Sequence, residues 1–219
     1  MNKHKLKGII FDLDGTLADT LEDISDSMNR VLQKEGFPVY TSGEYKNFIG
    51  SGIRNLVRLS LPENERSDSM IKRCTDLMGA VYTESCLIKT NLYDGISEIV
   101  DTFRLKGIKL AVFSNKADEF TQRIVRSLLH PKKFEMILGA KSSIPAKPDP
   151  AGALLISKHF GIDPQEIGFI GDSDIDMITA NKAAMFAIGA LWGFKTKAEL
   201  IAGGAKVLVE RPRELLEVL

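Results

Sequence analysis

The stretch GIIFDLDGTLADT, residues 8–20, decides the fold. Its apolar start, residues 8–13, is typical of a buried strand, and the strand ends in two aspartates, Asp12 and Asp14. Neighbouring carboxylates repel one another, and acidic residues are unfavourable in strands. On an extended chain, residues two apart point the same way, so both carboxylates would lie on one side of the strand end. The pair predicts either a solvated turn or a site that uses both acids.

Helical spacing replaces the strand pattern after residue 20. Leu21, Ile24, Met28, Val31 and Leu32 recur at the period of a helix, and Thr20 with Asp23 predicts a capping box before them. Further helices are expected over 44–60 and 66–85, and no strand is expected over 18–89. This part of the chain is therefore predicted to be an all-helical block.

Strand and helix patterns alternate in the rest of the chain. Strands are expected at 109–114, 134–140, 166–172, 186–191 and 207–209, with helical patterns between them. Such βαβ units predict a parallel sheet, so the fold class is α/β with a Rossmann-like core. The core is expected to comprise residues 1–17 and 90–219, and the helical block, residues 18–89, is expected to be an inserted cap. The cap would cover the C-terminal edge of the sheet, where open α/β sheets bind ligands.

Composition excludes several function classes for this chain of 219 residues. Lys plus Arg and Asp plus Glu both number 29, so neither nucleic acid nor an anionic membrane is expected as the main partner. The sequence has no run of about 18 apolar residues, so no membrane span is predicted. The two cysteines, Cys74 and Cys86, suggest neither a disulfide framework nor a zinc site, so a cytoplasmic location is expected. The sequence does not indicate the oligomeric state.

Polar residues follow the other expected strands at the same edge. Ser114 and Asn115 end the second strand, Asp172 ends a later one with Asp176 four residues on, and Lys147 precedes a helix start. Several carboxylates at one edge predict a hard cation, and Mg²⁺ fits because it also accepts a phosphate oxygen. A carboxylate nucleophile, a second carboxyl for proton transfer, a cation and a lysine fit phosphoryl transfer through an aspartyl-phosphate.

These residues resemble a known family. FDLDGT, FSNK, the lysine of AKPDP, and GDSDID resemble, in order, the four motifs of the haloacid dehalogenase-like phosphohydrolases. Within that superfamily the chain is similar to the phosphoglycolate phosphatase-like branch, which carries a helical cap after the first strand. The resemblance covers nearly the whole chain and implies a Mg²⁺-dependent phosphatase that acts on a small phosphorylated metabolite, a phosphoglycolate-like phosphomonoester.

The resemblance also implies a role for each motif residue. Asp12 would be the nucleophile and a metal ligand, and Asp14 the general acid and base, which also gives its backbone carbonyl to the metal. Asp172 would be the third protein ligand of the metal, and Asp176 would orient this site. The transferring phosphoryl group would be bound by the residues of the second and third motifs, Ser114, Asn115 and Lys147, and Lys147 would also stabilise its charge during catalysis.

Cap residues would select the substrate. Residues 50–54 (GSGIR) resemble the specificity loop of the family, so Gly52 and Arg54 are candidate substrate contacts. An exposed arginine on a helix is an equally good interpretation of Arg54. The substrate itself cannot be derived from the sequence: phosphoglycolate, a sugar phosphate, pyrophosphate and a nucleotide all remain open.

Plainer interpretations and other functions compete with this one. Lys147 could be a surface lysine, and Ser114 with Asn115 an ordinary helix cap. A phosphotransferase, such as a mutase of sugar phosphates, uses the same pair of aspartates. A dehalogenase is disfavoured because its first motif lacks the second aspartate. A receiver-type signalling domain also combines acids, a hydroxyl and a lysine, but it is much shorter and has no helical insertion.

Overall fold

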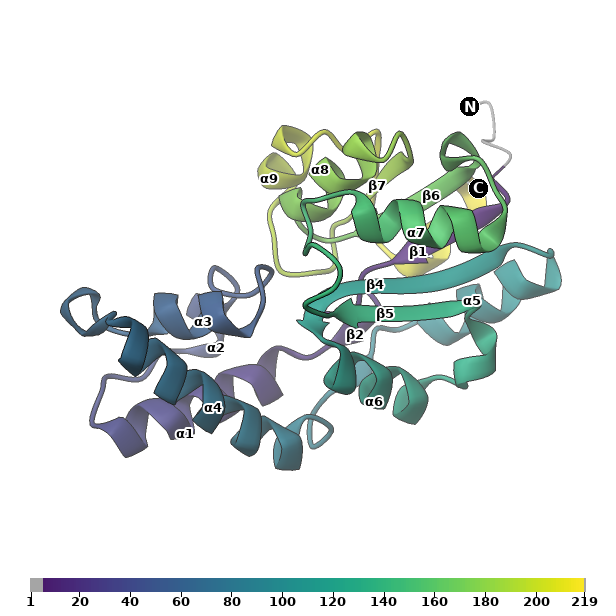
Figure 1. The fold of residues 1–219 in the computed structure, drawn as a ribbon. Helices are drawn as coiled ribbons and strands as arrows, with labels where there is room; N and C mark the ends of the chain where they lie inside the picture. The colour runs from purple at the N-terminus through teal and green to yellow at the C-terminus, as the bar shows by residue number, and fades with distance from the viewer. Residues whose placement is uncertain (1–5, 219) are drawn as a thin grey trace.

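A central sheet of parallel strands forms the core of the computed structural model, which describes residues 6–218 (Figure 1). The strand order is β5-β4-β1-β6-β7-β8, and every neighbouring pair is parallel. The strands are β1 (Gly8–Phe11), β4 (Lys109–Ala117), β5 (Met136–Ala140), β6 (Ile167–Gly171), β7 (Phe186–Ala190) and β8 (Val207–Val209). The predicted α/β fold with a Rossmann-like parallel sheet is confirmed.

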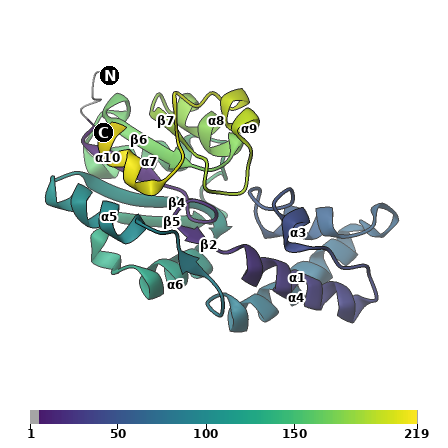
Figure 2. The same cartoon turned by 180° about the vertical axis from the view of Figure 1, so that it is seen from behind.

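Helices cover both faces of the sheet, as Figures 1 and 2 show from opposite sides. Successive strand residues point to opposite faces. Ile9 and Phe11 of β1 are therefore buried in one apolar cluster, and Ile10 is buried in the other. The first cluster is covered by α5 (Ile96–Leu105), α6 (Asp118–Leu128) and α10 (Leu215–Val218), and the second by α7 (Ala151–Phe160), α8 (Asp174–Lys182) and α9 (Lys197–Ala202).

Four helices form a separate bundle beside the C-terminal edge of the sheet (Figure 1). They are α1 (Leu21–Glu35), α2 (Ser42–Tyr45), α3 (Ile53–Ser60) and α4 (Asp68–Ser85). Their apolar faces make a cluster of their own, with Met28, Leu32, Val57 and Cys74 fully buried, and Phe120 of α6 joins it from the core. We call this bundle the cap.

A short antiparallel ribbon joins the cap to the core. The chain leaves the core along β2 (Ala18–Asp19) and returns along β3 (Asn91–Leu92), and these two strands pair with each other. The prediction that 18–89 contains no strand was wrong at this point. Its partner lies more than 70 residues away, so local sequence patterns could not reveal the pairing.

The predicted capping box at the start of α1 was also wrong. Thr20 precedes the helix, but its side chain makes no capping bond. Its hydroxyl instead donates to Asp14 Oδ1 at 2.7 Å. Asp23 is buried and accepts hydrogen bonds from the backbone nitrogens of Lys89 and Thr90 and from the Thr90 hydroxyl, at 2.7–3.0 Å. The acid in α1 therefore fastens the returning chain to the start of the cap.

Replacing Asp23 by alanine is expected to lower the free energy of unfolding by about 3 kcal/mol, because buried donors at Lys89 and Thr90 lose their acceptor. Urea unfolding measures this loss. Asp26→Ala is the matched control, since Asp26 forms only an exposed pair with Lys89 and should cost less than about 1 kcal/mol. Equal losses in the two variants would contradict the assigned role of Asp23.

Two further observations concern the whole described chain. No helix among residues 6–218 is both long and apolar enough to cross a membrane. Cys74 and Cys86 are buried free thiols, so no disulfide forms between them. Their burial raises the pKa of both thiols, which lowers their reactivity.

Candidate active site

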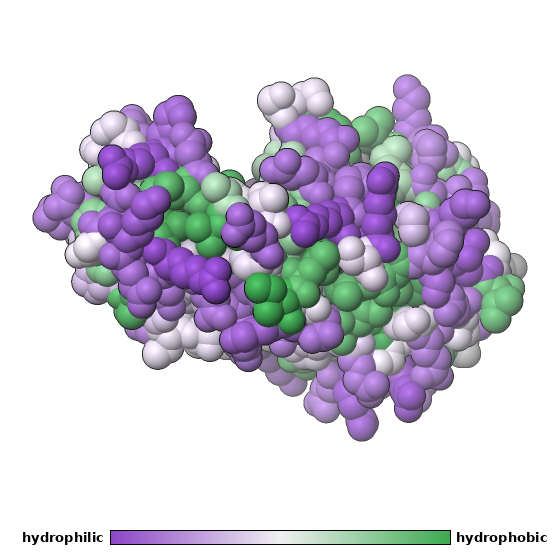
Figure 3. Space-filling view, turned by 90° about the horizontal axis from the view of Figure 1, so that it is seen from below, coloured by the Kyte–Doolittle hydropathy of each residue, from purple (hydrophilic) through white to green (hydrophobic). Residues whose placement is uncertain are grey.

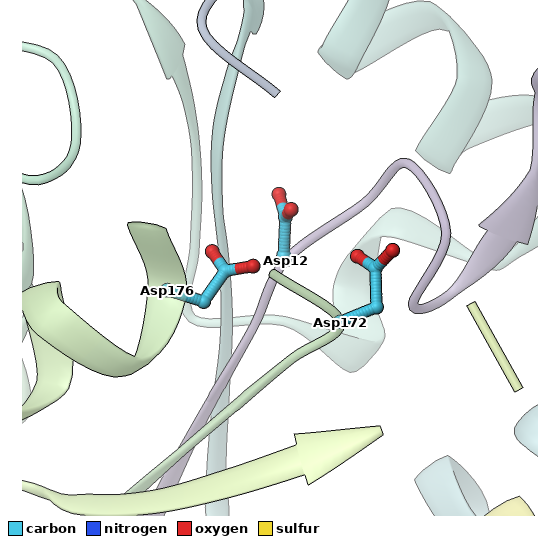
Figure 4. A group of neighbouring side chains, drawn as sticks. All are labelled: Asp12, Asp172 and Asp176. Carbon is cyan, nitrogen blue, oxygen red and sulfur yellow. The ribbon is translucent and has the colours of Figure 1, made fainter. Parts of the chain in front are cut away.

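Two aspartates meet where neighbouring strands end. In the sheet register Phe11 of β1 lies beside Ile170 of β6, so Asp12 and Asp172 follow adjacent strands at the same edge. Asp176, in the first turn of α8, completes a group of three buried carboxylates, in which one oxygen of each lies within 4.8 Å of one oxygen of the others. Figure 4 shows Asp12 between the other two side chains.

A buried lysine links two of these carboxylates. Lys147 Nζ lies 2.8 Å from Asp12 Oδ1 and 2.7 Å from Asp176 Oδ1, and only 2% of the Lys147 side chain is exposed. The other oxygen of Asp176 accepts from the backbone nitrogen and the hydroxyl of Ser173, at 3.1 and 2.6 Å. Both oxygens of Asp176 therefore have protein partners, and this residue holds Lys147 in place.

Burial and mutual repulsion change the proton affinity of the group. Burial raises the pKa of Asp12 to about 7; the charge of Asp176 adds to the rise, and Lys147 opposes it. Burial, with the charges of Asp176 and Asp12, also raises the pKa of Asp172 well above its ordinary value. For Lys147, burial alone would lower the pKa, but attraction by Asp12 and Asp176 outweighs it and the pKa is raised.

The charge balance favours a cation at this site. Three carboxylates face one ammonium group, so the fully ionised cluster carries an excess of two negative charges in a buried place. Buried charge is costly unless it is paired or coordinates a metal. Oxygen ligands in such a group suit a hard divalent ion. The residues of this carboxylate group therefore fit a divalent metal.

Asp14 stands apart from this carboxylate group. Its Oδ1 lies 3.2 Å from Lys116 Nζ and accepts from the Thr20 hydroxyl. Of the acids predicted at the metal, the structure brings together Asp12 and Asp172, and it adds the side chain of Asp176 rather than that of Asp14. The predicted metal contact through the Asp14 backbone carbonyl stays a prediction.

Ser114 and Asn115 are both buried and lie within β4, which continues to Ala117 and so ends three residues later than expected. The Asn115 amide group donates to the carbonyls of Lys147 and Gly50, at 3.0 and 2.9 Å, and its oxygen accepts from the Lys147 backbone nitrogen at 2.8 Å. The side chain of Asn115 thus holds the Lys147 backbone and the cap loop at Gly50. The Ser114 hydroxyl accepts a 3.3 Å bond from the Lys116 nitrogen. Phosphate binding by Ser114 and Asn115 stays a prediction.

Several contacts of the site residues were not identified from the sequence. Lys116 directly follows the Ser-Asn pair, but nothing in one sequence shows that it reaches Asp14 and, at 3.0 Å, the Tyr82 hydroxyl of the cap. Asp172 accepts from the Thr16 hydroxyl and the Phe194 backbone nitrogen, at 3.1 and 2.7 Å. Gly15, with φ +78°, lies so close that a side-chain Cβ would overlap the Asp172 carboxylate. The positive φ explains the glycine in the first motif.

A cavity extends from the carboxylates to the cap. Asp12, Asp14, Ser114 and Asp172 line its core side, and Gly52 lies on its cap side, as its prediction as a substrate contact requires. Arg54 does not line it: its guanidinium pairs with exposed Asp68 at 2.7 Å. Figure 3 shows the cap and the core as two lobes with a hollow between them.

Comparisons with known proteins agree with this geometry. A phosphoglycolate phosphatase of Aquifex aeolicus is 28% identical, with 98% of this chain and 97% of the relative covered. An N-acetylmuramic acid 6-phosphate phosphatase of Pseudomonas aeruginosa is also 28% identical, with 100% of this chain and 97% of the relative covered. A protein of Lactobacillus delbrueckii subsp. bulgaricus, provisionally assigned as a phosphoglycolate phosphatase, is 33% identical in sequence. Its crystal structure superimposes with a TM-score of 0.92, with 98% of this chain and 99% of that chain covered.

The family model agrees with these relatives. It describes haloacid dehalogenase-like hydrolases and matches residues 9–190, which include Asp12, Ser114 and Asp172. The match spans most of the chain and both the core and the cap. The chain therefore belongs to the haloacid dehalogenase-like hydrolases.

Proposed function

We propose that the protein is a Mg²⁺-dependent phosphatase that hydrolyses a small phosphomonoester through an aspartyl-phosphate on Asp12. The observation that carries this proposal is the buried group of Asp12, Asp172 and Asp176 with Lys147 between two of them. The family match and the phosphatase relatives confirm the predicted enzyme class, a haloacid dehalogenase-like phosphohydrolase. By the names of the relatives, phosphoglycolate is the first substrate to test.

The metal would be held by Asp12, Asp172 and the backbone carbonyl of Asp14. When bound, Mg²⁺ would neutralise negative charge on the oxygens of the transferring phosphoryl group. The hydrogen bonds from Thr16 and the Phe194 nitrogen fix the orientation of the Asp172 carboxylate. Such supporting bonds keep ligands in position before the ion arrives.

The side chains divide the chemistry into two steps. In the first, an oxygen of Asp12 attacks phosphorus, the bond from phosphorus to the leaving oxygen breaks, and Asp14, as the general acid, gives a proton to that oxygen. In the second, Asp14 takes a proton from a water molecule, the resulting hydroxyl group attacks phosphorus, and Asp12 leaves as a free carboxylate. Inorganic phosphate and the alcohol are the products.

Other residues hold the reacting groups during both steps. Lys147 touches Asp12 directly and would balance the charge on the phosphoryl oxygens. Asp176 positions Lys147 from one side, and Asn115 holds its backbone from the other. Ser114 would donate its hydroxyl to a phosphoryl oxygen.

The cap, residues 18–89, would enclose the substrate and select its leaving group. Support comes from the cavity between the cap and the strand ends, since closing a site excludes water from the reaction. The core, residues 1–17 and 90–219, would then supply the catalytic groups. The buried free thiols are consistent with the proposed cytoplasmic location.

Transfer to a second substrate molecule, as in a mutase, is the remaining alternative. The hydrolase family favours water as the acceptor. The match to this family does not support a receiver-type signalling domain. Free phosphate formed in equal amount to the alcohol product distinguishes hydrolysis from transfer.

Magnesium binding is expected to tighten as the pH rises through 7. Without metal, Asp12 has a pKa of about 7, so most of its carboxyl groups are protonated at pH 6, and the raised pKa of Asp172 favours its protonated form in the same direction. The ion must displace those protons, so affinity should fall roughly tenfold per pH unit below 7 for each proton released. Isothermal calorimetry at pH 6, 7 and 8 measures this, alongside Mg²⁺-dependent phosphate release from acetyl phosphate.

Two variants test the same site. Asp172→Asn should lose Mg²⁺ binding, and Asp174→Asn, which changes a neighbouring acid outside the carboxylate group, should keep it. An affinity independent of pH, or equal binding by Asp172→Asn and the parent, would exclude the proposed metal site.

A further inference from the structure

The roof of the cavity above the catalytic groups is apolar. Six apolar side chains from the cap and from α6 form most of it: Ile24, Ile49, Ile53, Leu56, Met78 and Phe120. The cap also contributes Gly50, Gly52 and Tyr82, whose hydroxyl is bonded to Lys116. Asp12, Asp14 and Ser114 lie on the opposite side of the same cavity. If Asp12 attacks phosphorus as proposed, the phosphoryl group lies against the core and the leaving alcohol points toward this roof. The following inference therefore rests on the proposed function.

The cap contributes no cation to the lining among residues 6–218. Arg54, the basic residue of the predicted specificity loop, pairs with Asp68 on the surface. The lysines that do line the cavity belong to the core. A substrate carboxylate pointing at the roof would therefore find hydrocarbon in place of a counter-ion.

Both core lysines beside the roof already have partners. The side chain of Lys116 is 7% exposed; its Nζ lies 3.2 Å from Asp14 Oδ1 and donates to the Tyr82 hydroxyl at 3.0 Å, 4.5 Å from the centre of the Tyr82 ring. Lys195 Nζ donates to the carbonyl of Lys46 in the cap at 2.9 Å. To bind a second anionic group of the substrate, Lys116 would have to share its charge with Asp14, and Lys195 would have to release the cap.

The balance of interactions distinguishes two kinds of leaving group. Burying a charged group against an apolar wall without a partner is costly. Burying hydrocarbon against the same wall is favourable, because both surfaces leave water. We infer that the substrate is a phosphomonoester whose alcohol presents an uncharged aliphatic or aromatic surface to the roof. A phosphomonoester whose alcohol carries a carboxylate, such as phosphoglycolate, is then a poor substrate.

Matched substrates test this inference with the unmodified protein and Mg²⁺. Benzyl phosphate and 4-carboxybenzyl phosphate differ only by a remote carboxylate, and isobutyl phosphate has the heavy-atom shape of phosphoglycolate without its charge. In each pair kcat/KM should be about tenfold or more higher for the uncharged member, because the carboxylate would lie unpaired against the roof. Most of the difference should appear in KM, as expected for a binding effect.

Roof variants make the assignment specific. Ile53→Lys places an ammonium group in a half-buried roof position and should shrink or reverse the preference within each pair. Ile53→Met changes shape without charge and should keep the preference. Lys195→Met should also keep it, because Lys195 is not needed to recognise an uncharged alcohol.

Acetyl phosphate separates failure of this inference from failure of the proposed function, because its small leaving group needs no apolar contact. Turnover of acetyl phosphate together with equal or better use of phosphoglycolate and 4-carboxybenzyl phosphate would overturn the substrate class and leave the phosphatase in place. A carboxylate preference that Lys195→Met removes would also overturn it, and would identify Lys195 as the anion-binding residue. No phosphate release from any of these compounds would overturn both.

Discussion

Asp12→Asn is expected to lower kcat for phosphate release by about 10⁴-fold or more, the usual scale for loss of a covalent nucleophile. An amide cannot attack phosphorus as the carboxylate does, and it also weakens the metal site. The measurement is Mg²⁺-dependent phosphate release from p-nitrophenyl phosphate. Asp149→Asn, at an exposed acid two residues after Lys147, should retain nearly full activity.

The same substitution is expected to stabilise the metal-free fold above pH 7. The pKa of Asp12 is about 7 in the folded protein, above the value near 4 of an unfolded chain. The folded state therefore binds the proton more tightly, and ionisation of Asp12 destabilises it as the pH rises through 7. Asparagine removes that cost, so the melting temperature at pH 8 without metal should rise. An active Asp12→Asn variant would exclude the aspartyl-phosphate route.

Lys147→Met is expected to have the second largest effect, on stability as well as on rate. Lys147 is the shared partner of Asp12 and Asp176, and removing one member of a buried ion pair costs about 3–5 kcal/mol. We expect a loss of that size in the free energy of unfolding at pH 8 without metal. Loss of a charge-stabilising donor should also lower kcat/KM by about 10²–10³-fold.

A double variant separates the two effects of Lys147. Asp176→Asn added to Lys147→Met removes one uncompensated carboxylate, so it should restore part of the stability without restoring activity. Lys141→Met is the matched control, because Lys141 forms a partly exposed pair with Asp118 and should cost less than about 1 kcal/mol. If Lys147→Met and Lys141→Met unfold at the same urea concentration, Lys147 is not the shared buried partner of these acids.

Local patterns predicted the fold class and the strands that carry the acids. The apolar runs that end in Asp12 and Asp172 could be identified as strands, because the length and the end of a strand are visible in residues adjacent in the sequence. The ends of parallel strands lie at one edge of the sheet. The sequence therefore also predicted that the polar residues after these strands lie close together. The family resemblance supplied the division of roles among them.

Contacts between distant segments could not be predicted in this way. That Asn115 binds phosphate stays a prediction, but the sequence did not indicate that its side chain also holds Lys147 and Gly50, which are 32 and 65 residues away. Thr20 was expected to cap a helix, but its hydroxyl bonds Asp14 because the turn after β1 brings the two together. Hydrogen-bonding side chains have several suitable partners, and only the folded arrangement decides among them.

The antiparallel ribbon of β2 and β3 has a consequence for how such a chain can diversify. Ala18 and Leu92 lie opposite each other, so the entire cap enters and leaves the core at a single point. For the folding of the core, an insertion whose ends meet behaves as one closed loop. The entropic cost of closing a loop grows only slowly with its length. A helical cassette of another size or sequence can occupy this position without moving the strand ends. Substrate preference and reaction chemistry can then evolve along separate stretches of one gene.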